Sequence, residues 1–272
     1  MTPSAPLLAA HEVTKRFGAV VALQKVSFEV YGGEVTCLLG DNGAGKSTLI
    51  GILSGVFAPD DGTLRLDGHD VRFRGPMDAL DQGIATVYQD LAVVPIMPVF
   101  RNFWLGREPH RGWGPLRRFD KARACEVVQH ELAEIGILVE DVHRPMSTLS
   151  GGQRQCVTIA RAAYFGAKVL ILDEPTSALG IKEAAIVLRY IQGARDRGLG
   201  VVFITHNLHH AIPVGDRFTI LEHGVVSASF EKGELAMEQV ADLVSGGAEG
   251  RTIRDALAAN AKRTPEAGYG IT

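Results

Sequence analysis

The chain has 272 residues, a net charge of −3 and 46% hydrophobic residues, as expected of one large globular domain or a domain with an inserted lobe. A balance this close to neutrality gives no support to nucleic acid as a partner. Its three cysteines show no CxxC spacing, which suits a reducing cytosol. We identify no secretory signal and no apolar run near the ~20 residues of a spanning helix, so we expect another chain to bring this one to any membrane.

The N-terminal region predicts a group of short strands. Residues 7–37 contain alternating or continuous apolar runs, which Gly18 and the pair Gly32-Gly33 interrupt. Such runs, bounded by glycine, are typical of strands joined by tight turns. We therefore expect an N-terminal antiparallel β subdomain.

A helix and two further strands follow. Residues 43–55 have apolar residues at helical spacing and close on a glycine, which predicts a helix. Residues 63–68 predict a short strand with a turn, and residues 84–89 predict another strand.

The character of the chain then changes, and residues from about 98 to 165 predict a helix-rich lobe. Residues 119–137 form a strongly amphipathic helical pattern, and residues 151–165 form a second one. Because strand patterns flank this segment, we interpret it as an α-helical subdomain inserted between strands.

Parallel strands are predicted beyond the lobe. Residues 169–172 and 201–204 are short, continuous apolar runs, as expected of strands covered on both faces. A helical pattern over residues 182–198 separates them. Together with the earlier strands they indicate an α/β fold with a mainly parallel sheet.

The chain ends on a hairpin and a polar segment. Residues 217–231 predict two strands that turn at His223-Gly224. Residues 246–272 are rich in glycine, alanine and charged residues, and we expect a C-terminal tail that is mobile in part.

The most informative motif is "GDNGAGKST", which follows an apolar strand and opens a helix. This context and spacing fit a phosphate-binding loop, whose backbone N–H groups and helix N-terminus bind an anion. We expect Lys46 to reach the β- and γ-phosphates and the Ser47 hydroxyl to ligate Mg²⁺. A glycine-rich turn without a ligand is the alternative. The candidate residues are Gly40, Asp41, Asn42, Gly43, Ala44, Gly45, Lys46, Ser47 and Thr48.

Two adjacent carboxylates, Asp173 and Glu174, follow the apolar run 169–172. In phosphate-loop nucleotidases a carboxylate at the end of a neighbouring strand binds the Mg²⁺. We therefore assign Asp173 to the metal and Glu174 to the attacking water as its general base. A solvated turn is the alternative.

A third motif, "LSGGQ", opens the second helix of the lobe. Ser150 is placed to cap this helix, and Gly151 and Gly152 are expected to leave exposed amides that accept a phosphate. An ordinary capped helix start is the alternative.

Taken together, these residues closely resemble the nucleotide-binding subunit of ATP-binding cassette (ABC) transporters over about residues 7–245. "GDNGAGKST" is similar to Walker A, "VYQD" to the Q-loop, "LSGGQ" to the signature, "VLILDE" to Walker B, "SALG" to the D-loop and "ITHN" to the switch. The resemblance implies an ABC-type nucleotide-binding domain over residues 1–245. It has a P-loop NTPase core and the helical subdomain inserted at about 98–165.

The resemblance also implies a dimer in which two ATPs lie between Walker A of one subunit and the signature of the other. The partner is then an identical chain or a second ABC cassette. Ser150, Gly151, Gly152 and Gln153 would contact the nucleotide held by that partner.

Three further residues receive roles from the resemblance alone. Phe17 would stack on adenine, with a core phenylalanine as the alternative. Gln89 would join the shell of Mg²⁺ and water, and His206 would hydrogen-bond the γ-phosphate. The cofactors implied are ATP and Mg²⁺.

The run 87–109 resembles the monosaccharide-import branch of the family, in particular single-cassette members of the fructose type. "SALG" ends on Gly180, where most of the family has an aspartate that couples the two sites. The branch implies a transmembrane sugar permease, an extracytoplasmic sugar-binding protein acting indirectly, and a peripheral position on the cytoplasmic face of the membrane.

Residues 90–110 are the expected contact surface for the permease. Their apolar side chains, Phe100, Phe103, Trp104 and Leu105, exceed what a solvated loop needs. Packing inside the helical lobe is the alternative.

Other functions are weighed against sugar import. An exporter or lipid-handling cassette is an alternative within the family. A soluble chromosome-maintenance or translation ATPase is disfavoured because neither a long coiled coil nor a fused pair of cassettes occurs. The signature and the lobe argue against a small phosphate-loop kinase or GTPase.

Overall fold

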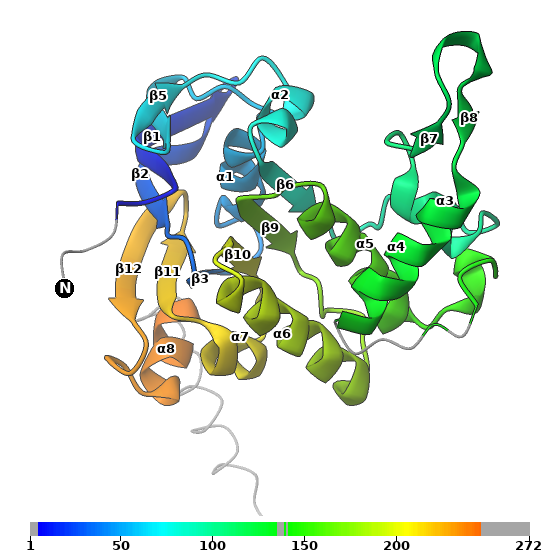
Figure 1. Ribbon diagram of the computed structural model, residues 1–272. Coiled ribbons are helices and arrows are strands. Elements are labelled where there is room, and N and C mark those ends of the chain that lie inside the picture. The colour runs from blue at the N-terminus through cyan, green and yellow to red at the C-terminus, as the bar shows by residue number, and fades with distance from the viewer. Residues whose placement is uncertain (1–4, 135–138, 140, 246–272) are drawn as a thin grey trace, which may run out of the picture.

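A computed structural model describes residues 5–134, 139 and 141–245 (Figure 1). The predicted tail, 246–272, lies outside the described residues. The strands are β1 (Leu8–Phe17), β2 (Val20–Val30), β3 (Val35–Leu39), β4 (Asp61–Leu66), β5 (His69–Val71), β6 (Ile84–Val87), β7 (His110–Arg111), β8 (Arg118–Phe119), β9 (Val169–Asp173), β10 (Gly200–Ile204), β11 (Arg217–Glu222) and β12 (Val225–Glu231). The helices are α1 (Lys46–Leu53), α2 (Pro76–Asp81), α3 (Val99–Trp104), α4 (Lys121–Glu134), α5 (Gly151–Tyr164), α6 (Ile181–Asp196), α7 (Leu208–Val214) and α8 (Met237–Val244), with 3₁₀ turns η1 (Gly114–Leu116) and η2 (Met146–Thr148).

Two sheets form the body of the molecule. An antiparallel sheet has the order β2-β1-β4-β5, and a larger one has the order β12-β11-β3-β10-β9-β6. In the larger sheet β11, β3, β10, β9 and β6 are parallel, and β12 pairs with β11 as the predicted hairpin. The α/β fold with a mainly parallel sheet and an N-terminal antiparallel sheet is confirmed.

Helix α1 packs between the two sheets. Its apolar residues, among them Leu49 and Ile52, belong to one buried cluster with Val13 and Phe28 of the antiparallel sheet and Val202 of β10. A helix that is apolar on nearly all sides is stable only when it is covered on both faces. This packing fixes the start of α1, and therefore the preceding loop, against the end of β3.

The opposite face of the parallel sheet is covered by helices. Leu170 and Leu172 of β9 join Phe203 of β10 in a second buried cluster with α5 and α6. Because side chains alternate along a strand, Val169 and Ile171 face α1 instead. The continuous apolar runs of the sequence follow from burial on both faces.

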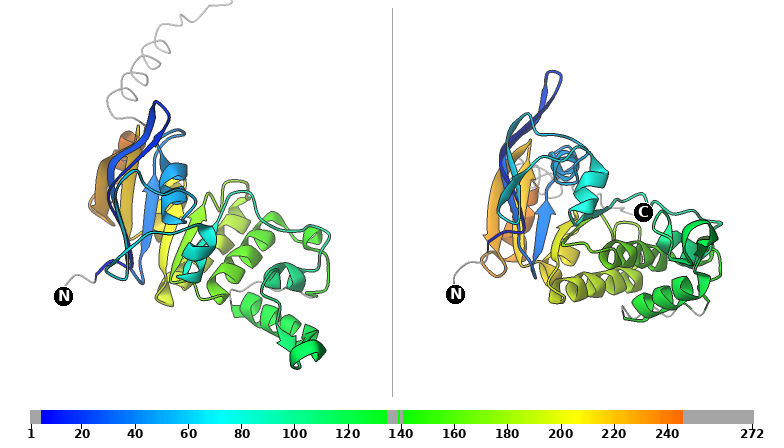
Figure 2. Two further views of the ribbon diagram at one scale, coloured as in Figure 1. Left: turned by 90° about the horizontal axis from the view of Figure 1, so that it is seen from above. Right: turned by 45° about the horizontal axis from the view of Figure 1, so that its top comes forward.

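Helices α3, α4 and α5 lie beside β6 and β9, on the side away from β11 and β12 (Figures 1 and 2). Phe100, Phe103 and Trp104 are at most 5% exposed and form the core of this part. The expectation that these aromatic side chains present a surface to a permease is therefore wrong. These side chains are buried because α3, α4 and α5 each have an apolar face, and these faces pack against one another.

A small hairpin, β7–β8, rises from the helical part beyond α3 and α4 (Figure 1). No sequence pattern predicts this hairpin. Its strands are only two residues long, too short for an alternating pattern to identify.

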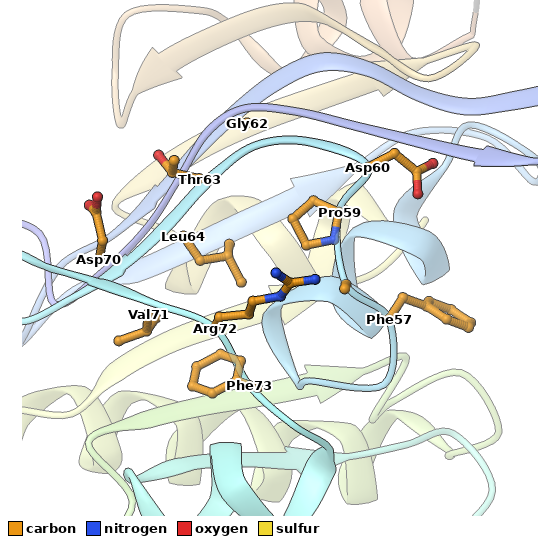
Figure 3. A pocket seen from close by; sticks show the side chains of 11 residues that line it. Phe57, Pro59, Asp60, Gly62, Thr63, Leu64, Asp70, Val71, Arg72 and Phe73 are labelled. Carbon is orange, nitrogen blue, oxygen red and sulfur yellow. The ribbon is translucent and has the colours of Figure 1, made fainter.

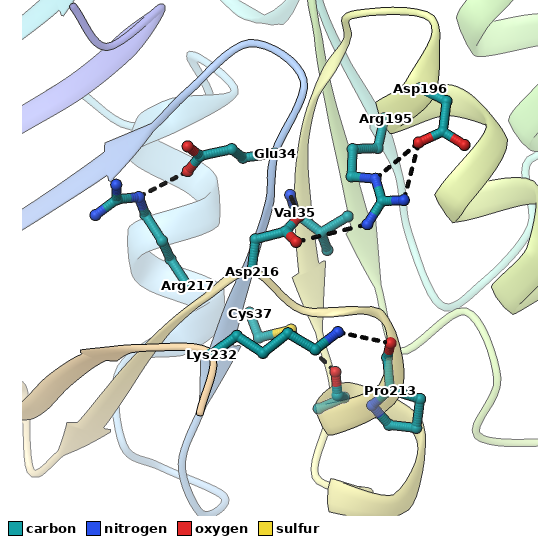
Figure 4. Close-up of polar contacts among 10 residues, drawn as sticks. Glu34, Val35, Cys37, Arg195, Asp196, Pro213, Asp216, Arg217 and Lys232 are labelled. Atoms are coloured by element: carbon teal, nitrogen blue, oxygen red, sulfur yellow. Dashed lines mark hydrogen bonds and ion pairs between the residues drawn. The ribbon is translucent and has the colours of Figure 1, made fainter. Parts of the chain in front are cut away.

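Polar contacts join elements that are distant in sequence (Figure 4). The Asp216 carboxylate accepts a 2.8 Å hydrogen bond from the Val35 amide and lies 3.5 Å from Arg195 Nη1. Arg217 Nε lies 2.7 Å from Glu34 Oε2. These contacts anchor the start of β11 beside β3 and α6.

None of the helices in the described part of the chain combines the length and the apolar character needed to cross a membrane.

Candidate active site

The candidate site lies where the parallel strands end. The phosphate-binding loop follows β3, Asp173 is the last residue of β9, and Gln89 follows β6 by two residues. The carboxyl ends of parallel strands share one edge of the sheet, which is where ligands bind in open α/β sheets. The fold thus brings three separate sequence motifs to one edge.

These residues border one cavity of about 470 Å³. It includes nine of the residues predicted for the site: Asn42, Gly43, Gly45, Lys46, Ser47, Thr48, Gln89, Asp173 and Glu174. Gly40, Asp41 and Ala44 belong to the same loop but do not line it. The volume and the polar lining suit a small, charged ligand.

The loop needs glycine at position 45. Gly45 has φ +105°, and a Cβ there would lie 2.9 Å from the Ala22 carbonyl oxygen and 2.8 Å from a methyl of Leu23. Its neighbour Lys46 donates hydrogen bonds to the carbonyl oxygens of Gly40, at 2.6 Å, and Asp41, at 2.9 Å. The ammonium group is thus positioned across the loop.

The charged groups at this edge influence one another. Burial lowers the pKa of Lys46, while Glu174, Asp41 and Asp173 act in the opposite direction. Burial raises the pKa of Asp173, and the neighbouring charge of Glu174 raises it further. A cation bound here would lower the pKa of Asp173 and so oppose both effects.

Glu174 is held by the strand and loop of the candidate switch. Its Oε1 accepts a 3.0 Å hydrogen bond from the His206 amide and lies 2.8 Å from His206 Nδ1. The residue has φ +48°, a strained conformation for a non-glycine residue that is often found at functional sites. Its other oxygen, Oε2, is buried and has no hydrogen-bond partner among the described residues, so it remains able to accept a proton.

The oxygen donors of the cavity suit a magnesium ion. Asp173 supplies a carboxylate, Ser47 a hydroxyl and Gln89 an amide oxygen, and hard oxygen ligands are those that Mg²⁺ prefers. The raised pKa of Asp173 fits a carboxylate that acts beside a cation.

Several predicted residues lie outside the cavity lining. His206 contacts Glu174 but does not border the cavity, and its side chain is 68% exposed. Phe17 is 44% exposed, which rules out the alternative of a core phenylalanine. It packs edge-to-face on Phe57 at 5.3 Å, and its strand partner Val20 does line the cavity.

The "LSGGQ" motif begins α5, and none of its residues lines the cavity. Ser150 caps the helix as predicted, since its Oγ accepts a 3.3 Å bond from the Gln153 amide and Gln153 Oε1 accepts one from the Ser150 amide. Gly152 is buried rather than exposed, and a Cβ there would lie 2.8 Å from Cβ of Glu183. The Ser150 hydroxyl, with the Gly180 and Gly152 amides, lowers the pKa of Glu183.

Four residues of the cavity were not predicted from the sequence: Val20, Val21, Ala22 and His223. The first three begin β2, and His223 lies in the predicted hairpin turn. No local pattern shows that these segments meet the phosphate-binding loop. Only the packing of the β1–β2 hairpin beside β11 and β12 brings them there.

A second hollow of about 400 Å³ lies between β4, β5 and the loop after α1 (Figure 3). Arg72 extends across it toward Pro59. No residue of the phosphate-binding loop borders it, so it is distinct from the candidate site.

Comparisons with known proteins agree on one family. The family model described as "ABC transporter" matches residues 23–177. A fructose import ATP-binding protein of Rhizobium meliloti is 41% identical over 260 residues, which are 93% of this chain and 98% of that protein. A xylose/arabinose import ATP-binding protein of Sulfolobus acidocaldarius is 43% identical over 246 residues, 90% of this chain and 96% of that one.

Solved structures show the same fold. The crystal structure of a nucleotide-free ATP-binding cassette from an ABC transporter superposes with a TM-score of 0.77 at 24% identity, covering 92% of this chain and 99% of that one. At this identity the likeness concerns the fold alone.

Proposed function

Since this chain belongs to the ABC transporter family as an ATP-binding, ATP-hydrolysing subunit, we propose that it powers import of a monosaccharide through a separate membrane permease. In this proposal residues 1–245 form one nucleotide-binding domain, with the helical subdomain inserted at about 98–165. The domain works as a dimer at the cytoplasmic face of the membrane.

One observation carries the hydrolytic part of the proposal. Lys46, Asp173 and Glu174 come from two segments about 130 residues apart, yet they border the same cavity. The positively charged Lys46 side chain beside two carboxylates matches what transfer of a phosphoryl group to water requires.

Binding begins with the phosphate-binding loop. The amides around Gly43 and Gly45, with the N-terminus of α1, face the β- and γ-phosphates of ATP. Lys46 moves its hydrogen bonds from the carbonyls of Gly40 and Asp41 to phosphate oxygens, where it offsets their charge.

Glu174 accepts the proton in the chemical step. As the water oxygen bonds to the γ-phosphorus, the bond to the β-phosphate oxygen breaks, and ADP and inorganic phosphate are formed. The water proton passes to the Glu174 carboxylate, whose Oε2 has no other partner among the described residues. His206 fixes the carboxylate through Oε1.

Ser47, Asp173 and Gln89 are the residues proposed to hold Mg²⁺. The ion would neutralise charge that develops on the phosphate oxygens. Asp173 is the anionic ligand in this set, and its raised pKa is expected to fall when the ion is bound.

The dimer is proposed because the signature lies outside the cavity of its own chain. A capped helix start carrying Ser150, Gly151, Gly152 and Gln153 would complete the site of the partner, which is an identical chain or a second cassette. Phe17 is proposed to stack on adenine from the exposed hairpin that also carries Val20 and Val21.

The sugar is assigned by the nearly full-length likeness to the fructose and xylose/arabinose import proteins. A permease and an extracytoplasmic binding protein are the partners that this assignment implies.

Replacement of Glu174 by glutamine tests the chemical step. We expect kcat to fall by roughly 10²–10⁴-fold, the usual contribution of a general base, while ATP binding persists. ATP should then trap a dimer, measured by sedimentation velocity. Glu238→Gln on α8 removes a distant carboxylate and is the matched control. A Glu174→Gln protein that hydrolyses ATP at the normal rate would remove Glu174 from this role.

Reconstitution tests the sugar assignment. The chain is purified with its permease in proteoliposomes, and ATP hydrolysis is measured with the binding protein loaded with fructose, ribose or xylose. Stimulation by one of these sugars is expected. Stimulation only by a non-sugar solute would overturn the transport assignment and leave the ATPase assignment intact.

A further inference from the structure

The β7–β8 hairpin exposes large apolar side chains at its tip. Trp113 is 90% exposed and Leu116 is 72% exposed, although a tryptophan is usually well buried in a protein. The hairpin projects from the helical part and away from both sheets (Figure 1). Its tip therefore faces outward from the molecule.

The conformation of the tip is defined by its backbone. Gly112 has φ +88°, and a Cβ there would lie 2.7 Å from the carbonyl oxygen of Leu116. The Leu116 amide donates a 3.2 Å hydrogen bond to the Trp113 carbonyl. This turn holds both apolar residues at the end of the hairpin.

Positive charge surrounds the tip. Residues 109–119 include three arginines and no carboxylate, although the whole chain has a net charge of −3. Arg111 and Arg118 are direct cross-strand partners, and two like charges in this position repel each other. None of Arg111, Arg117 and Arg118 forms an ion pair with a carboxylate of residues 5–134, 139 and 141–245. An external anion would relieve the repulsion.

The base of the hairpin is anchored. Phe119 stacks on the buried ring of Phe100 with a centroid distance of 6.2 Å. The Asp120 amide donates a 2.8 Å hydrogen bond to the Pro109 carbonyl. The hairpin is therefore a rooted arm with an apolar, cationic end.

We propose that this arm binds the surface of an anionic lipid bilayer. Trp113 and Leu116 enter the boundary between headgroups and acyl chains, where tryptophan is favoured. Arg111, Arg117 and Arg118 lie against lipid phosphates. A single-stranded nucleic acid also uses aromatic and arginine side chains, but it requires an extended basic groove, whereas this cationic site is confined to one short hairpin.

Vesicle flotation with the full-length protein tests the proposal. Vesicles of phosphatidylcholine alone are compared with an equimolar mixture of phosphatidylcholine and phosphatidylglycerol, without nucleotide or permease. Binding is expected only to the mixed vesicles and should weaken as salt screens the charges. This assay is independent of ATP hydrolysis, so its outcome is separate from that of the proposed function.

Variants assign the binding to the hairpin. The double substitution Arg111→Gln/Arg118→Gln should lower the partition coefficient by about 25-fold, at roughly fivefold for each charge near the surface. The control variant Arg74→Gln/Arg189→Gln replaces two exposed arginines outside the hairpin. It has the same net charge as the hairpin variant and should bind as the unmodified protein does.

Fluorescence reports insertion of the tip. The chain has two tryptophans, and Trp104 is buried with its Nε1 bonded to the Ala124 carbonyl. A blue shift on addition of mixed vesicles therefore reports Trp113. It should disappear in Trp113→Ser, and Met77→Ser on α2 serves as the apolar control.

Three outcomes would overturn the proposal: no preference for the anionic vesicles, equal binding by the hairpin variants and the controls, or an unshifted Trp113 spectrum in vesicle-bound protein. Retention on a homopolymer RNA that outcompetes the vesicles would assign the hairpin to nucleic acid instead.

Discussion

At the scale of single residues, burial and charge decide which groups can act. Asp173 illustrates this, because desolvation and the charge of Glu174 both disfavour its ionised form. Because the pKa of Asp173 is higher in the folded than in the unfolded state, this carboxyl makes its full contribution to stability below the unfolded pKa, about 3.9. That contribution is lost as pH rises through the folded pKa. The ionised carboxylate therefore weakens the nucleotide-free fold at neutral pH.

Replacement of Asp173 by asparagine is expected to stabilise the nucleotide-free protein at pH 7. Solvent screening of a half-buried carboxylate limits the gain to less than about 1 kcal/mol. The stabilisation that Mg²⁺ with ATP gives to the unmodified protein should be absent from the variant. Thermal unfolding with and without Mg²⁺ and ATP measures both effects. An Asp173→Asn protein that is less stable than the parent without nucleotide would contradict this account.

Gly180 can be replaced without strain in the chain. It has φ −67° as the N-cap of α6, and a Cβ there would meet nothing within 4 Å. The backbone conformation at the end of the "SALG" motif therefore does not require glycine.

We expect Gly180→Asp to fold normally, with a free energy of unfolding within about 0.5 kcal/mol of the parent. Urea unfolding measures this difference. Gly45→Ala is the contrasting control, since its Cβ would clash with the Ala22 carbonyl. A large loss of stability in Gly180→Asp would contradict this account, because it would show that the fold of the chain itself requires glycine at this position.

At the scale of elements, α5 and α6 begin at one junction. The Glu183 carboxylate, in the first turn of α6, accepts a 3.4 Å hydrogen bond from the Gly180 amide. It also interacts with the Ser150 hydroxyl, which contributes most to its lowered pKa. The start of the signature helix and the end of the D-loop are thus joined within one subunit.

Glu183→Gln should weaken this junction in a pH-dependent manner. A lowered folded-state pKa gives stability that is present above the unfolded pKa, about 4.3, and is lost as pH falls through the folded pKa. The variant should therefore melt below the parent at pH 7, and the difference should vanish at acidic pH. Differential scanning fluorimetry across pH measures it. Glu126→Gln on the exposed side of α4 is the control, and a pH-independent deficit in Glu183→Gln would point to lost packing instead.

At the scale of the whole molecule, the core of the helical part is continuous with the core that covers one face of the parallel sheet. Phe103 is fully buried among Trp104, Tyr164 and Phe165, with ring centroids 5.5–5.9 Å from it. These residues connect α3 with the end of α5. The aromatic side chains therefore stabilise the helical part rather than bind a partner.

Phe103→Ala should destabilise the protein by about 3–5 kcal/mol, the usual cost of a cavity left by a core phenylalanine. Chemical unfolding measures the change, with the exposed Met77→Ala as control. A Phe103→Ala protein with unchanged stability would require that the cavity collapses fully.

Sequence alone determined the longer strands and helices and nine of the residues that line the candidate cavity, because these depend on local rules. Apolar runs identified β9 and β10. The glycine spacing before α1, together with the helix that follows it, predicts a phosphate-binding loop. Local rules could not predict the short β7–β8 hairpin or the burial of Phe100, Phe103 and Trp104. The identity of an apolar residue does not show whether its side chain lies in a core or on a surface. Tertiary structure decided what depends on packing between distant segments: the contact of His206 with Glu174, the entry of Val20 and His223 into the cavity, and the burial of Gly152 on Glu183. Such contacts arise from the order in which strands join a sheet, and no single segment records that order.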